Sequence, residues 1–120
     1  MQAEPQKTVF VVDEDPAHRE SLKWLIESMD YRVRCYASAQ EFLKGHALGA
    51  SGCLVIDAGL PAAAGLETAK DLAENGFGIP VILLVGPDAI STPAGAIDCL
   101  EKPVADQALF DRIRDAIGRN

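Results

Sequence analysis

The chain has few aromatic residues, few basic residues and no long apolar segment. Aromatic residues make up 6% of its 120 residues, and 11 Lys and Arg stand against 18 Asp and Glu, which gives a formal charge of −7. Because binding to nucleic-acid phosphates depends on Lys and Arg, this domain is not expected to bind nucleic acid directly. No apolar run approaches the roughly 20 residues of a membrane span, and the first residues lack an apolar signal core. We therefore expect a cytoplasmic protein without membrane contact.

Cysteine is also scarce, and its distribution argues against a disulfide framework or a metal–thiolate site. Cys35, Cys53 and Cys99 are an odd number, are widely spaced, and lie in apolar stretches without a CxxC pair. Such residues are typically buried, reduced thiols. With 48% hydrophobic residues, a chain of 120 residues can bury a core without covalent links, and we expect a single domain over residues 1–120.

Strand patterns alternate with helical patterns along the chain. Residues 8–12, 53–56 and 81–85 are nearly continuous apolar runs typical of buried parallel strands, whereas residues 32–36 alternate as an edge strand does. Residues 96–100 form a fifth strand pattern that one charge interrupts. This order predicts an α/β fold, a doubly wound five-stranded parallel sheet in the flavodoxin-like order 2-1-3-4-5.

The helical segments differ in how clearly the sequence marks them. Asp15 caps the first helix, and Ser38 with Glu41 forms a capping box for the second. A third helix is expected over residues 65–75. Residues 86–95 contain two prolines and two glycines, so the helix between the fourth and fifth strands is expected to be degenerate or missing. The expected buried faces are His18, Leu22, Leu25, Ile26 and Met29 in the first helix and Leu109, Phe110, Ile113 and Ile117 in the last.

Acidic side chains follow two strands that the predicted order makes neighbours. Asp13 and Glu14 end the first strand, and Asp57 ends the third. At about 4 Å and an effective dielectric constant of about 20, each pair of these carboxylates repels by on the order of 4 kcal/mol. A divalent cation would offset that repulsion, and Mg²⁺ suits a site of carboxylates, one backbone carbonyl and water. Gly59, two residues beyond Asp57, is well placed to donate the carbonyl.

A cationic residue is expected at the same edge of the sheet. Lys102 follows the fifth strand and would add a point charge for a phosphoryl group. Together with the acidic cluster, it describes an aspartate, Asp57, that attacks a phosphoryl donor while metal and ammonium stabilise the transferred oxygens.

Three short motifs occur in order along the chain. They are Val-Val-Asp-Glu-Asp-Pro at residues 11–16, Asp-Ala-Gly-Leu-Pro at residues 57–61 followed by Gly65, and Glu-Lys-Pro at residues 101–103. By these motifs the chain resembles the receiver domains of bacterial two-component response regulators over nearly its full length.

The resemblance implies a role for each candidate residue. Asp57 would be the phosphoacceptor, Lys102 would contact the phosphoryl group, and Asp13 and Glu14 would hold Mg²⁺ together with the Gly59 carbonyl. The implied partner is a sensor histidine kinase or a phosphotransfer protein. A receiver is a phosphoryl acceptor with slow self-dephosphorylation at most, not a turnover enzyme.

Two single positions and one segment depart from the family pattern. Val85 stands where receivers usually carry a Thr or Ser that bonds the phosphoryl oxygen, and Cys99 stands at the usual aromatic switch position. The segment at residues 86–95 replaces a regular helix. We therefore expect an atypical receiver, in which a rearrangement of a loop relays the signal.

The sequence leaves open two alternative functions and the question of whether the chain is part of a longer protein. A receiver-like module could act without phosphate as a docking or dimerisation surface, including a homodimer. A haloacid dehalogenase-type phosphatase would share the D-x-D spacing of Asp13 and Asp15, although Pro16 starts a helix where such enzymes need an insertion. The chain is expected to be either a stand-alone regulator or a piece of a longer protein with an effector domain.

Overall fold

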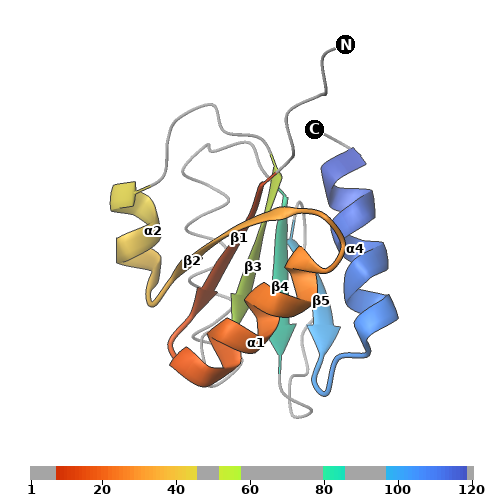
Figure 1. Cartoon of the computed structure of the whole chain (residues 1–120), viewed down its shortest axis with the longest axis horizontal. Coiled ribbons are helices and arrows are strands. Elements are labelled where there is room, and N and C mark those ends of the chain that lie inside the picture. The colour runs from red at the N-terminus through yellow and green to blue at the C-terminus, as the bar shows by residue number, and fades with distance from the viewer. Residues whose placement is uncertain (1–7, 46–51, 58–79, 86–96, 119–120) are drawn as a thin grey trace.

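The computed structural model describes residues 8–45, 52–57, 80–85 and 97–118. Within them, five parallel strands form one sheet in the order β2-β1-β3-β4-β5, which confirms the predicted topology (Figure 1). The elements are β1 (Thr8–Asp13), α1 (Pro16–Glu27), β2 (Arg32–Tyr36), α2 (Ala39–Gly45), β3 (Gly52–Asp57), β4 (Val81–Val85), β5 (Ile97–Glu101) and α4 (Asp106–Gly118).

The burial of each strand follows its place in the sheet. β3 is buried along its whole length, and β1 is buried from Val9 to Asp13, because both lie inside the sheet between other strands. β2 is an edge strand in which exposed Arg32 and Arg34 alternate with partly buried residues, as its sequence pattern predicts. Carboxylates that end β1 and β3 are therefore held by the most buried part of the sheet.

Helices cover both faces of the sheet. α1 and α4 cover one face, and α1 crosses in front of the strands in Figure 1 with α4 beside it. Phe42 of α2 packs on the opposite face, where its ring lies 5.5 Å from that of Phe10. The core under α1 and α4 is made by Val9, Val11, Leu22, Ile26, Cys53, Val55, Ile82, Leu84, Leu109, Ile113 and Ala116.

The signals at the helix starts act as predicted. The Asp15 carboxylate accepts hydrogen bonds from the backbone N–H groups of Ala17 and His18, and Pro16 occupies the first turn of α1. The Ser38 hydroxyl likewise accepts a hydrogen bond from the backbone N–H of Glu41, at 3.1 Å. Both caps fix where their helices begin, and the first also fixes the orientation of the turn that follows β1.

The predicted helix faces are largely confirmed. Leu22 and Ile26 of α1 are buried, while Trp24 on the outer side is 62% exposed. In α4, Leu109 and Ile113 are buried as expected, but Ala116 completes the buried face and the predicted Phe110 is only partly buried. None of the helices in the described ranges is long and apolar enough to cross a membrane.

Two of the predicted cysteines are described. Cys35 and Cys53 are free thiols, as expected. Burial raises the pKa of Cys53 to about 12 and also raises the pKa of Cys35, so both thiols stay protonated near neutral pH. The predicted third helix at residues 65–75 and the degenerate segment at residues 86–95 lie outside the described residues.

Candidate functional site

The carboxylates of Asp13 and Asp57 lie side by side at the carboxyl edge of the sheet. The two residues are register partners at the ends of β1 and β3, so their Cα atoms face each other across the ladder. They are only 1% and 3% exposed, respectively. Side chains alternate along a strand, and Asp13 and Asp57 fall on the same face as Val11 and Val55, which is the face that α1 covers. The predicted meeting of these two acids is confirmed.

Lys102 supplies the positive charge of the site. Its Nζ lies 3.1 Å from Oδ1 and 3.2 Å from Oδ2 of Asp57, and its side chain is 36% exposed. The backbone N–H of Lys102 donates a 2.7 Å hydrogen bond to the carbonyl of Val85, which ties the end of β5 to the end of β4. Lys102 therefore meets Asp57, as the sequence predicts.

His18 is a member of the site that sequence reasoning did not identify. Its Nδ1 is hydrogen-bonded to Oδ2 of Asp13 and lies 3.2 Å from Oδ2 of Asp57. The sequence pattern does place His18 on the inner stripe of α1, four residues before Leu22. That stripe runs over apolar core further along the helix, but at the first turn it meets the acidic edge of the sheet. The sequence alone does not show that the first turn of this helix lies against the acidic edge of the sheet.

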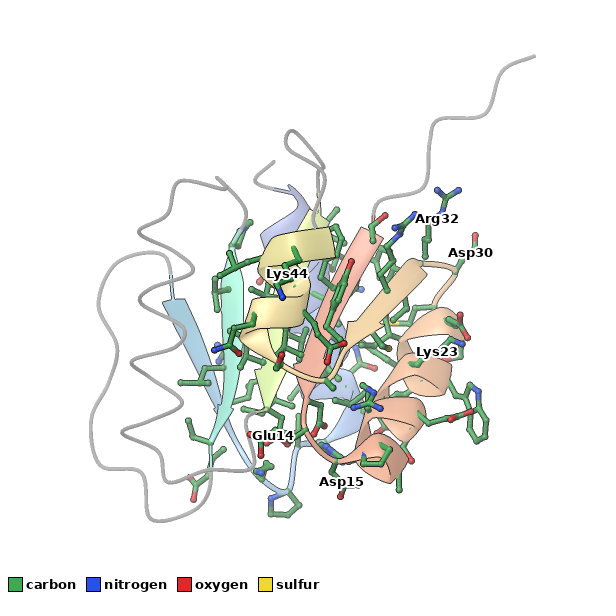
Figure 2. All side chains as sticks on the ribbon, turned by 90° about the vertical axis from the view of Figure 1, so that its left-hand side faces the viewer. Glu14, Asp15, Lys23, Asp30, Arg32 and Lys44 are labelled. Atoms are coloured by element: carbon green, nitrogen blue, oxygen red, sulfur yellow. The ribbon has the colours of Figure 1, made fainter. Side chains whose placement is uncertain are left out.

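Glu14 does not join the acidic group. It is exposed, whereas the group of potential metal ligands within the described residues consists of Asp13, His18 and Asp57, with atoms within 4.8 Å of one another. Glu14 follows the last residue of β1, and in Figure 2 it lies with Asp15 at the lower edge of the sheet. Adjacency in sequence therefore did not bring Glu14 beside Asp57, because β1 ends at Asp13 and Glu14 lies in the bend beyond the strand, where its side chain is exposed.

The site opens into a cleft of about 310 Å³ lined by Asp13, Asp15, His18, Asp57 and Lys102. The backbone around it is held on both sides. The Asp15 backbone N–H donates to Oδ1 of Asp13 at 3.0 Å, and the Arg19 guanidinium donates to the Asp13 carbonyl at 2.7 Å. The acids therefore sit in a braced turn and face a space large enough for an ion and small anionic groups.

Burial destabilises the charged form of Asp13. Burial raises the pKa of the Asp13 carboxyl above its usual value of 3.8, and the charge on Asp57 adds to that rise. The hydrogen bonds from the Asp15 backbone and from His18 oppose the rise without cancelling it. A buried carboxyl group with a raised pKa beside a second carboxylate is typical of functional sites.

Replacing Asp13 with Asn is expected to stabilise the fold by about 1 kcal/mol at neutral pH without divalent cations. The folded state holds the Asp13 proton more tightly than the unfolded state, so the wild type loses stability as pH rises from 3.8 through the raised pKa. The advantage of Asp13→Asn should vanish below pH 3.8 and be complete above the raised pKa. Urea unfolding across pH in EDTA measures it, and an equal or lower stability of the variant at neutral pH would contradict the raised pKa.

The remaining predicted site residues are placed only in part. Val85 ends β4 and is partly exposed, next to the backbone of Lys102. Cys99 belongs to β5, where it pairs in register with Leu83, but its side chain lies outside what the structure describes. Gly59 lies outside the described residues. The geometry thus brings together Asp13, Asp57 and Lys102 of the predicted set and adds His18.

Comparison with known proteins gives a consistent result. Residues 9–114 match the family model of the response regulator receiver domain. The chain is 37% identical over 120 residues to the transcriptional regulatory protein TdiR of Thauera aromatica, and this match covers 94% of the chain and 52% of TdiR. It is 38% identical over 117 residues to the transcriptional regulatory protein FixJ of Azorhizobium caulinodans, covering 93% of the chain and 56% of FixJ. The chain spans about half the length of these curated relatives.

Solved structures agree with the sequence comparisons. The response regulator StyR superimposes with a TM-score of 0.83 at 34% identity, over 97% of this chain and 61% of StyR. The crystal structure of FixJ-N superimposes with a TM-score of 0.81 at 28% identity, over 98% of both chains. The similarity to FixJ-N therefore extends over nearly the whole of both chains.

Proposed function

This chain belongs to the response regulator receiver domain family, and from that membership we propose that Asp57 is the residue that accepts the phosphoryl group. Receiver domains are the phosphoacceptors of two-component signalling, and a phosphoacceptor is not a turnover enzyme. Membership of the family also implies a histidine kinase partner. Membership of this family rules out the haloacid dehalogenase-type phosphatase considered from the sequence. The observation that carries the proposal is the pairing of buried Asp57 with Asp13 and Lys102 at one edge of the sheet.

The proposed transfer requires little rearrangement of the described residues. A carboxylate oxygen of Asp57 attacks phosphorus, a new P–O bond forms, and the P–N bond of the donor phosphohistidine breaks as its imidazole leaves. Lys102, which contacts both Asp57 oxygens, would then contact the phosphoryl oxygens instead. Burial of Asp57 on a rigid central strand holds the attacking oxygen in place.

We propose that Mg²⁺ is the metal of this reaction. The donor set fits, because the buried carboxylates of Asp13 and Asp57 face the cleft and carboxylate oxygens are the ligands that a hard cation prefers. Asp13, Asp57 and the Gly59 carbonyl would hold it, and Glu14 would add negative charge from the residue next to Asp13. When bound, Mg²⁺ would neutralise charge on the carboxylates and on the transferred phosphoryl oxygens.

We also propose that the output differs from that of a typical receiver. Val85 has no hydroxyl to bond a phosphoryl oxygen, although the backbone at this position is hydrogen-bonded to Lys102. Together with Cys99 at the aromatic switch position and the two prolines in the sequence of residues 86–95, this supports a relay through loop rearrangement. A cytoplasmic location remains part of the proposal. A phosphotransfer protein and a second copy of the chain are further proposed partners.

The test of the proposed function is the intact mass of the wild-type protein after incubation with acetyl phosphate and Mg²⁺. One added phosphoryl group is expected, and omission of Mg²⁺ with EDTA present should suppress it. A conventional receiver treated in parallel serves as the positive control. An unchanged mass of this protein beside a phosphorylated control would contradict the proposal.

A second candidate function is a receiver-like docking or dimerisation module that works without phosphate. Val85 favours it, because a residue without a hydroxyl at the end of β4 cannot sense the phosphoryl group directly. The buried acid pair opposes it, because burying two carboxylates together is costly for a scaffold that binds no cation. Binding of Mg²⁺ in the millimolar range, measured by calorimetry, would favour the phosphoacceptor over the module.

A further inference from the structure

The imidazole of His18 occupies an unusual place between the two buried acids. Its Nδ1 contacts the Oδ2 atoms of both Asp13 and Asp57. The side chain is 40% exposed, so one side of the imidazole faces the carboxylates and the rest borders the open cleft. One nitrogen and two carboxylate oxygens thus converge on a single point beside solvent.

The backbone holds this arrangement before any ligand arrives. His18 lies in the first turn of α1, whose position is fixed by the Asp15 cap and by Pro16. The next residue, Arg19, ties the same turn back to the Asp13 carbonyl. The turn that carries the imidazole is therefore tied to the end of β1 before any ligand binds, which preorganises His18.

The atoms are spaced for a shared cation. The three potential ligand atoms lie within 4.8 Å of one another. Nitrogen and oxygen ligands sit about 2.0–2.2 Å from a bound zinc ion, so they are separated by about 3–4 Å from each other. Closing the group onto one ion requires side-chain movements on the order of 1 Å.

The chemistry of the set differs from that of an all-oxygen site. Mg²⁺ selects oxygen ligands and keeps its waters, whereas imidazole nitrogen suits Zn²⁺, Co²⁺ and similar ions. One imidazole with two carboxylates and an open side is the kind of three-ligand set that holds zinc with an exchangeable fourth position. Replacing an oxygen ligand by nitrogen should therefore shift the preference of the site away from Mg²⁺.

We propose that His18 is a direct ligand, with Asp13 and Asp57, of the divalent cation in this cleft, and that it gives the site a preference for Zn²⁺ and Co²⁺ over Mg²⁺. This inference rests on the proposed function, because it concerns the same cation site. His18 of α1 would then be the residue that determines metal selectivity beside the phosphoacceptor. An ion held by His18 would also be bound by Asp13 and by Asp57, the proposed phosphoacceptor. The identity of the bound metal would therefore set how readily Asp57 reacts.

The test is a set of metal affinities measured by calorimetry on wild type and on His18→Leu, starting from EDTA-treated protein. The ratio of Zn²⁺ affinity to Mg²⁺ affinity is expected to fall at least about tenfold in His18→Leu, since even an indirect partner of a ligand is worth that much. His46→Leu, which removes the other histidine of the chain, is the matched control and should keep the wild-type ratio. An unchanged ratio in His18→Leu would overturn the proposal.

A direct observation of the ligand atom completes the test. In wild-type protein labelled with nitrogen-15 histidine, Zn²⁺ is expected to shift the Nδ1 resonance of His18, assigned by its loss in His18→Gln. A Zn²⁺ titration that leaves this resonance in place would show that His18 only hydrogen-bonds the acids. Since no phosphodonor is present, these results are independent of the phosphorylation assay. Failure of phosphate uptake would remove the proposed function while leaving a His18-dependent zinc affinity as it was measured.

Discussion

Replacing Asp57 with Asn is expected to abolish phosphoryl uptake from acetyl phosphate in the presence of Mg²⁺. The amide has no anionic oxygen to attack phosphorus, and it removes one of the two buried carboxylates that would hold the cation. Asp57 is also the described contact of the Lys102 ammonium, so the variant loses the pairing that positions this cation. We expect the added mass that is predicted for the wild type to be absent from Asp57→Asn at every time point.

Asp111→Asn is the matched control for this experiment. Asp111 lies on α4, where its carboxylate pairs with the Arg114 guanidinium and accepts from the Gln107 amide, and its side chain is 48% exposed. The substitution makes the same change of charge away from the cleft, and phosphoryl uptake should match the wild type. Full uptake by Asp57→Asn would assign the acceptor to another residue. Equal loss in both variants would trace the effect to net charge rather than to the nucleophile.

The topology and the central acid pair could be predicted because they depend on patterns that are local in sequence. The apolar runs at β1, β3 and β4 and the alternation in β2 fix which strands are central. Right-handed crossovers then leave few ways to order the strands. Asp13 and Asp57 terminate neighbouring strands at the same edge, and their register pairing follows from that order.

The composition of the cluster could not be predicted, because it depends on where single side chains point. Glu14 is next to Asp13 in sequence, yet the end of β1 leaves it exposed outside the acidic group. His18 is five residues away, yet the turn before α1 brings its imidazole onto Asp13. An apolar stripe predicts which face of a helix points inward. It does not predict that the first residue of the stripe, His18, contacts carboxylates rather than apolar core residues.

The hydrogen bond between the backbones of Lys102 and Val85 offers a route by which a signal could leave the site. Val85 is held by backbone pairing to Lys102, so a change in the contacts of Lys102 at Asp57 has a covalent and hydrogen-bonded route to the end of β4. That route needs no hydroxyl at position 85. It supports our proposal that loop rearrangement, rather than a threonine contact, carries the output.

Only glycine fits at position 52, where β3 begins and pairs with the start of β1. Its φ of +142° lies in a region that L side chains rarely adopt. A Cβ atom built at this position would lie 1.7 Å from the carbonyl oxygen of Thr8, its register partner on β1. That neighbour is backbone within the ladder, so it cannot move aside without opening the β1–β3 pairing.

Replacing Gly52 with Ala is therefore expected to lower the free energy of unfolding by about 3 kcal/mol or more, through backbone strain and lost pairing between β1 and β3. Because β3 carries Asp57, the loss should also loosen the site at the other end of the strand. Gly118→Ala is the control: nothing lies within 4 Å of its added Cβ at the end of α4, and its stability should change by less than about 1 kcal/mol. Urea unfolding of both variants measures the difference, and equal stabilities would show that the strand pair does not begin with this close approach.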